Sequence, residues 1–160
     1  MIDEICLNET LLAGAKEIFE TMIFVNFEES SGGQEDIIEG DSILGSITFK
    51  GGIEGCFGIC CSVPCAKTIA LNMLAMDPSE ELSEAEISDA IGEVTNMIMG
   101  GVKSRILDAV GNIEVSIPIV TSGQGLENSL GEVAIKASVK VNLDNNYIAE
   151  MSMLYRESSE

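Results

Sequence analysis

The chain has 160 residues with 27 acidic side chains, 8 basic ones and no histidine, so its formal net charge is −19. Hydrophobic residues make up 46% of it, which predicts one folded domain over residues 1–160 and excludes a disordered acidic tail, because such a tail lacks the apolar residues for a core. The absence of histidine excludes a Ser-His-Asp triad and a histidine-bound zinc site, and the scarcity of lysine and arginine argues against nucleic-acid binding.

The first half of the chain predicts one helix and a β-hairpin. Apolar residues recur at helical spacing over residues 4–23, and a short strand is expected at residues 24–28. Residues 29–41 hold five acids and no base, which predicts a solvated loop. Residues 43–50 and 53–63 alternate between apolar and polar positions and predict two strands. The two glycines between them are typical of a tight hairpin turn.

The second half predicts two helices and three strands. Pro64 suits a first helical position, and residues 66–76 after it predict a short apolar helix. Ser83 and Glu86 form a capping box, which starts a helix that ends near Val110. Three alternating stretches predict strands at residues 113–120, 133–141 and 147–153, which are expected to form a meander. This order predicts an α+β fold, in which helices, including one long helix, pack on one face of a mainly antiparallel sheet.

The long predicted helix carries a line of residues beside its apolar stripe. Five residues recur at intervals of four, three, four and three, which places them along one face: Asp89, Glu93, Asn96, Gly100 and Lys103. A glycine inside a helix costs about 1 kcal/mol relative to alanine, so Gly100 and Gly101 need a reason, and close approach of another surface would be one. Spacing alone leaves two interpretations, a partner surface or solvated acids with glycines packed against a neighbouring strand.

The spacing of this helix and the strand after it resembles a known family. Asp89-x3-Glu93-x2-Asn96, followed after 21 residues by Pro118, is similar to the signature of the CheC/CheX/FliY phosphatases of bacterial chemotaxis. The first predicted helix has no second ExxN motif, so the chain resembles the single-motif CheX pattern. The resemblance covers most of the chain and is sharpest over residues 89–123. Pro118 has no catalytic role in this interpretation and is expected at a strand edge or bulge.

The resemblance implies a phosphatase that hydrolyses the aspartyl phosphate of a CheY-like response-regulator receiver domain, and a homodimer in which sheets join across subunits. It implies that Asn96 orients the attacking water and that Glu93 contacts the receiver's active-site lysine. The receiver is expected to bring its own Mg²⁺, with no cofactor bound by this chain. Asp89, Gly100 and Lys103 are expected to contact the partner. Hydrolysis of an acyl phosphate depends on positioning and charge neutralisation, so the lack of histidine is compatible with this reaction.

The remaining features predict the cellular location. The acidic N-terminus lacks the features of a signal peptide, and no apolar run approaches the roughly 18 residues that span a membrane. An odd number of cysteines, five, fits a reducing compartment. These observations predict a cytoplasmic protein without membrane insertion.

Two alternative functions stay open at this point. The same fold could be a non-catalytic binding module that docks to a receiver, a flagellar switch component or another regulatory protein. Four cysteines could instead hold zinc or an iron–sulfur cluster: Cys56, Cys60, Cys61 and Cys65. Strand alternation places Cys56 and Cys60 on one face and Cys61 on the other, so no metal site is predicted, and packing as small hydrophobic side chains is the favoured role.

Overall fold

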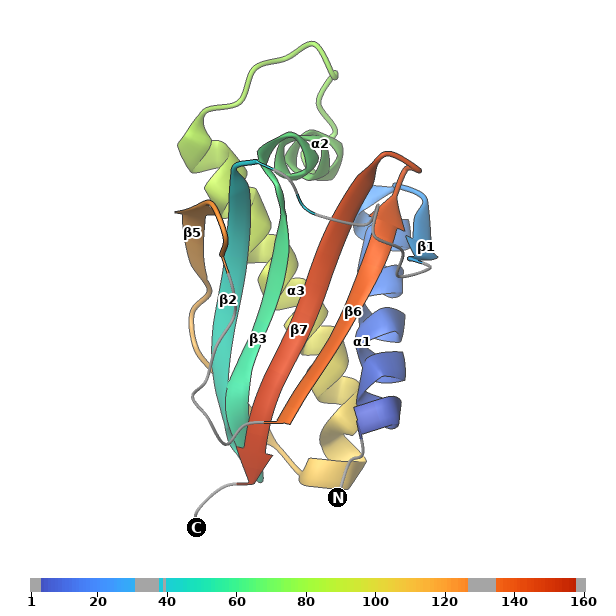
Figure 1. Ribbon diagram of the computed structural model, residues 1–160, viewed down its shortest axis with the longest axis vertical. Coiled ribbons are helices and arrows are strands. Elements are labelled where there is room, and N and C mark those ends of the chain that lie inside the picture. Colours follow the sequence, from blue (N-terminus) through green and yellow to red (C-terminus); the bar gives the residue numbers. More distant parts are fainter. Residues whose placement is uncertain (1–3, 31–37, 39, 127–134, 158–160) are drawn as a thin grey trace.

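The computed structural model describes residues 4–30, 38, 40–126 and 135–157, and within them three α-helices lie on one face of a seven-stranded sheet (Figure 1). The helices are α1 (Glu4–Ile18), which continues into a π-helical turn, η1 (Phe19–Ile23), α2 (Val63–Met73) and α3 (Glu84–Val110). The strands are β1 (Phe27–Glu29), β2 (Ser42–Gly51), β3 (Ile53–Ser62), β4 (Ile113–Val115), β5 (Ile119–Gly123), β6 (Ile135–Leu143) and β7 (Tyr147–Glu157). The predicted α+β class is confirmed. Most of the predicted loop at residues 29–41 lies outside the described residues.

The sheet has the order β1-β6-β7-β3-β2-β4, and β5 also pairs with β2. Every described pairing is antiparallel. The predicted meander of three final strands is wrong, because only β6 and β7 form a hairpin, while β4 and β5 pair with β2 on the other side of the sheet. Alternation along a strand determines its faces and not its neighbour, so the pattern could not reveal this pairing.

The first strand after the long helix is two strands and not one. β4 ends with Val115 opposite Phe49, and β5 begins with Ile119 opposite Ser46. Four steps along this edge therefore face three steps along β2, which leaves one extra residue and makes a bulge. Pro118 lies in this interruption, where its missing N–H group removes no bond from the ladder.

The helix starts follow from their caps. The capping box of α3 is present, with the Glu86 backbone N–H donating to Ser83 Oγ at 3.1 Å and the Ser83 N–H donating to Glu86 Oε1 at 3.2 Å. α2 begins at Val63, earlier than predicted, because Ser62 Oγ accepts a hydrogen bond from the Cys65 N–H and acts as its N-cap.

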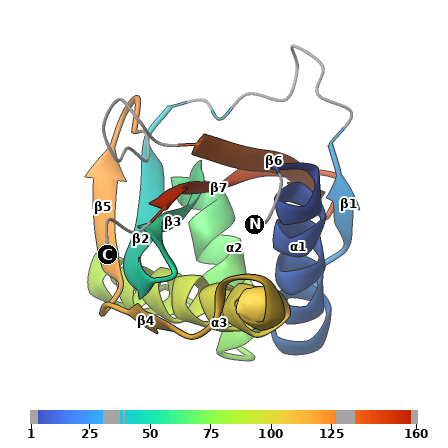
Figure 2. The same ribbon diagram turned by 90° about the horizontal axis from the view of Figure 1, so that it is seen from below.

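The helices and the sheet enclose a single apolar core. Seen from below, the sheet curves around the helix layer from β5 on one side to β1 on the other (Figure 2). The inner side chains of the strands and the inward faces of the helices are buried together, among them Phe57, Ile59, Val94, Ile98 and Met151. One face of α3 is thus held against the sheet, which leaves its opposite face exposed.

Candidate functional site

The predicted site residues lie together on the exposed face of α3, and we call Asp89, Glu93, Asn96, Gly100 and Lys103 the α3 line. All are exposed except Lys103, which is partly buried. The apolar stripe on the other side of the helix is buried, as at Ile91 and Val94. The line therefore forms a convex surface along about 21 Å of helix, since each residue adds about 1.5 Å.

Charge changes sign along the line. Its N-terminal part holds Asp89 and Glu93, and its C-terminal end holds Lys103. The neutral Asn96 lies between these two parts. The surface thus offers a partner a negative part, a neutral amide and a positive end.

Two strands contact the turn of α3 that carries Glu93 and Asn96. Thr95 faces β2 and is fully buried, and it lies directly over Gly45. At Gly92, an added Cβ would lie 3.6 Å from Val120 Cγ2 and 3.8 Å from Pro118 Cγ, so the bulge packs beside the same turn. The sequence alone did not indicate that Gly45, Gly92 and Thr95 support the site. The one available signal was a glycine inside a predicted strand, which often marks close approach of another backbone.

The two mid-helix glycines have different surroundings. Gly101 packs against α1, where its added Cβ would lie 3.6 Å from Gly14 Cα. The interpretation that both glycines pack against a strand is therefore wrong, because a second helix is the neighbour. An added Cβ at Gly100 would meet nothing within 4 Å. Packing within the described chain thus accounts for Gly101 and not for Gly100.

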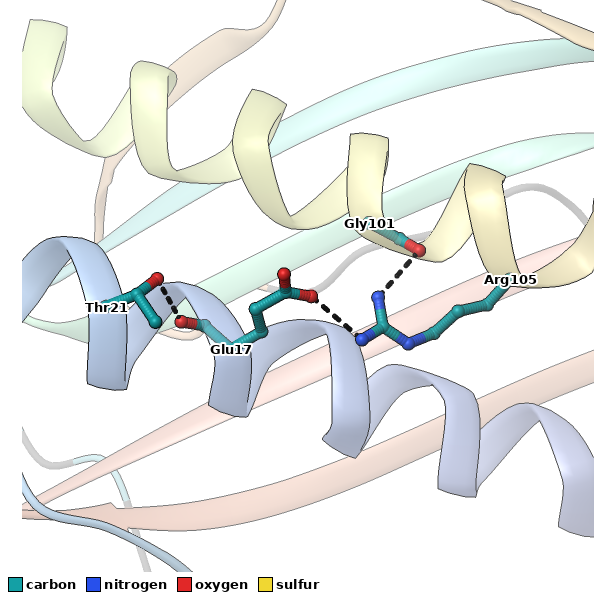
Figure 3. Close-up of polar contacts among 4 residues, drawn as sticks. All are labelled: Glu17, Thr21, Gly101 and Arg105. Atoms are coloured by element: carbon teal, nitrogen blue, oxygen red, sulfur yellow. Dashed lines mark hydrogen bonds and ion pairs between the residues drawn. The ribbon is translucent and has the colours of Figure 1, made fainter.

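An ion pair joins the two helices beside this crossing. Arg105 extends from α3 and donates through Nη2 to Glu17 Oε2 on α1 at 2.8 Å (Figure 3). Its Nη1 donates to the carbonyl oxygen of Gly101 at 3.1 Å. The pair is substantially exposed, so its contribution to stability is small, in the range of 0–1 kcal/mol typical of surface pairs. Its effect is to link the C-terminal half of α3 to α1.

The cysteine cluster is divided between the two faces of β3. Cys61 and Cys65 are buried among the helices, and their mutual hydrogen bond, together with burial, raises the pKa of Cys61 well above its usual value of 9.0. Alternation places Cys56 and Cys60 on the opposite face, and burial raises the pKa of Cys60. In the part of the chain that the structure describes, no three Cys, Asp or Glu side chains are grouped so that they could hold a metal ion.

Comparison with known proteins identifies the family. The family model described as "Chemotaxis phosphatase CheX" matches residues 43–138, which is more than half of the chain. The chain belongs to the CheX family. The matched range includes the whole α3 line and Pro118. A search of curated proteins gives no match. None of the helices among the described residues is long and apolar enough to cross a membrane.

Solved structures of chemotaxis proteins share the CheX fold. Chemotaxis protein CheX from Vibrio vulnificus is 24% identical, with a TM-score of 0.77, and the match covers 98% of this chain and 100% of that chain. The CheX–CheY–BeF3–Mg complex from Borrelia burgdorferi gives 22% identity, the same coverage and a TM-score of 0.75. FliY from Thermotoga maritima is 18% identical, with a TM-score of 0.62, over 92% of this chain and 85% of that chain. The resemblance to the CheC/CheX/FliY proteins is confirmed at the level of family and fold.

Proposed function

We propose that this chain hydrolyses the aspartyl phosphate of a CheY-like response-regulator receiver domain. The observation that carries the proposal is the exposed pair of Glu93 and Asn96 at the centre of the α3 line, in a member of the chemotaxis phosphatase family. The similar CheX of Borrelia burgdorferi was solved in a complex with CheY, BeF3 and Mg²⁺, which supports a receiver as the partner. A convex helix face also suits a protein partner, since small substrates are usually held in cavities.

In the proposed reaction this chain contributes two side chains, Asn96 and Glu93. Water attacks the phosphorus in line, the bond from phosphorus to the receiver's aspartate breaks, and the products are inorganic phosphate and the free carboxylate. Asn96 orients the water, because its amide can accept a hydrogen bond from water and donate another toward the phosphoryl oxygens. It also lacks a negative charge that would repel those oxygens. Glu93, one turn earlier on α3, contacts the receiver's active-site lysine.

The rest of the proposed site belongs to docking. The receiver supplies the Mg²⁺ that neutralises the phosphoryl group, and this chain binds no cofactor. Asp89 contacts the receiver on the N-terminal side of the catalytic pair. Gly100 and Lys103 contact it on the C-terminal side, where the missing side chain of Gly100 allows close approach. The helix thus binds the receiver on both sides of the reacting atoms.

The test is phosphate loss from the phosphorylated receivers of the source organism. The wild-type protein should accelerate dephosphorylation of at least one of them, and Asn96→Ala and Glu93→Ala should each lower kcat by about 10²-fold, because correct positioning supplies rate factors of this size. Asp108→Ala is the matched control, since Asp108 is exposed on α3 but lies outside the line. Full activity of both variants would contradict the assigned roles. Receiver binding without acceleration would instead indicate the non-catalytic docking module.

We also propose that the protein is a homodimer. Among the described residues, β4, β5 and the first half of β6 have one lateral side without a paired strand. Large apolar side chains are exposed on these strands, including Ile119 at 66% and Ile135 at 49%. Uncovered strand edges are templates for pairing with a second chain. Sedimentation velocity should give a dimer mass at micromolar concentration, and a monomer over the whole concentration range would contradict the proposal.

A further inference from the structure

α3 lies very close to β2 directly under the proposed catalytic pair. Gly45 lies in β2, opposite Ile59 of β3 and Val120 of β5. A Cβ added at Gly45 would collide with Thr95 Oγ1 and would lie 3.1 Å from Ile91 Cγ2. A side chain at position 45 is therefore incompatible with the observed height of the helix above the sheet.

Thr95 fills this space with a hydrogen-bonded hydroxyl. Its side chain is fully buried, and Oγ1 donates to the carbonyl oxygen of Ile91 at 2.7 Å. The hydroxyl is thus satisfied within α3, although it faces an apolar part of the sheet. Thr95 directly precedes Asn96, and Glu93 lies two residues earlier, so the three residues belong to one turn of the helix. A change in the height of Thr95 would move the other two with it.

The position of this turn matters because it is at the centre of the α3 line. Asp89 begins the line and Lys103 ends it, and the Gly45–Thr95 contact is close to its midpoint. The C-terminal half of α3 is held independently, through the packing of Gly101 on α1. Pressure from below at Thr95 would therefore bow the helix outward at Asn96 relative to both ends of the line.

We infer that Gly45 and Thr95 are positioning residues for Asn96, an inference that rests on the proposed function. A receiver that docks on both ends of the line is held at a fixed height, and the Gly45–Thr95 contact sets the height of Asn96 relative to it. Relief of the collision in Gly45→Ala requires a movement of roughly 1 Å, because non-bonded heavy atoms need about 3.5 Å. A misplacement of this size can lower a rate by about 10²-fold.

The decisive experiment is a compensating pair of substitutions, measured as kcat and KM on the phosphorylated receiver. Gly45→Ala should lower kcat by about 10²-fold and change KM by less than about threefold, because docking uses the ends of the line. In Gly45→Ala/Thr95→Ala the colliding hydroxyl is absent, and kcat should recover to within about threefold of Thr95→Ala alone. A double variant as slow as Gly45→Ala would overturn the inference.

Two further variants separate positioning from simple packing and from failure to fold. Thr95→Val keeps the shape of the side chain and should retain kcat. Thr95→Ile enlarges the side chain from the helix side, so it should lower kcat even if Gly45→Ala does not fold. Gly45→Ala or Thr95→Ile could fold with a lowered melting temperature and still have a normal kcat. That result would show that Gly45 and Thr95 have a purely structural role. Wild-type protein and the Asn96→Ala variant are assayed in the same experiment. If the wild-type protein has no phosphatase activity, the proposed function itself is wrong.

Discussion

Gly100→Ala tests separately whether the glycine at position 100 is required for the stability of the fold and whether it is required for binding of a partner to this face of α3. Gly100 is exposed, and an added Cβ would meet no atom within 4 Å. Alanine is more favourable than glycine in a helix interior by about 1 kcal/mol. With no collision to offset this gain, Gly100→Ala should stabilise the protein by about 1 kcal/mol, which raises the melting temperature of a domain of this size by about 2–4 °C.

The same substitution is expected to impair binding of the receiver. A methyl group added to a closely packed surface typically costs about 1–3 kcal/mol, so KM for the phosphorylated receiver should rise by at least about fivefold. Thermal unfolding and steady-state dephosphorylation by one preparation measure both effects. A gain in stability together with an increase in KM would place Gly100 in the interface, because only the partner would then be affected by the added methyl group.

Gly101→Ala is the matched control for this pair of measurements. It offers the same gain in helix propensity, but its Cβ would lie 3.3 Å from Arg105 Nη1 and 3.6 Å from Gly14 Cα, so part of the gain should be lost against α1. Its KM should stay at the wild-type value, because Gly101 faces the neighbouring helix. An unchanged KM in Gly100→Ala would refute the assignment of Gly100 to the interface. A lowered melting temperature in Gly100→Ala would refute the argument from open space.

Three further outcomes are expected. KM should rise with ionic strength, because residues 77–89, at the N-terminal end of the α3 line, hold six acids and no base. Hydrogen bonds from Ser79 also hold the pKa of Asp77 below its usual value, so that its charge persists. A KM independent of salt would contradict this expectation. Phe24→Asn should raise the free energy of unfolding by about 1 kcal/mol in chemical denaturation. Phe24 has φ of 60°, which asparagine tolerates better, and its side chain is 74% exposed, so backbone strain is relieved with little loss of burial. A lower stability would show that the phenyl ring contributes by packing. The folded state holds the Cys61 thiol proton more tightly than the unfolded state, because the pKa of Cys61 is raised by folding. Its contribution to stability should therefore be complete below pH 9 and should decline as the pH rises above 9. Cys61→Ala should show a smaller decline in stability at alkaline pH.

The long helix was predictable because its ends and its faces have strong local signals. The capping box at Ser83 and Glu86 starts α3 where expected, and α3 ends with Gly111 as its C-cap. The spacing of the α3 line also determined which residues share a face, since 3.6 residues per turn leaves no freedom once the helix exists. Family membership is confirmed by the match over residues 43–138.

The arrangement of elements around the helix was less predictable because it depends on residues far apart in the sequence. β4 and β5 pair with β2, although β6 and β7 are their next strands along the chain. The contact between Gly45 and Thr95 joins positions separated by 50 residues, and neither residue type specifies the other. The start of α2 was misplaced for a different reason, since Ser62 also fits the end of a strand and its role as N-cap emerges only from the bond to Cys65.

The composition that excluded so many enzyme classes is consistent with a site completed by a second protein. An exposed helix face with one amide and one carboxylate at its centre can orient water, but its only base, Lys103, lies two turns from Asn96, so the centre has no positive group beside a phosphoryl anion. In the proposed reaction the receiver supplies the metal ion, the lysine and the leaving carboxylate, so a chain without histidine lacks nothing that the chemistry requires. In that proposal, this chain contributes geometry, namely the distance of Asn96 from the reacting phosphorus. That distance depends on how closely α3 lies on β2, and a glycine on the strand side allows an approach that any side chain there would prevent.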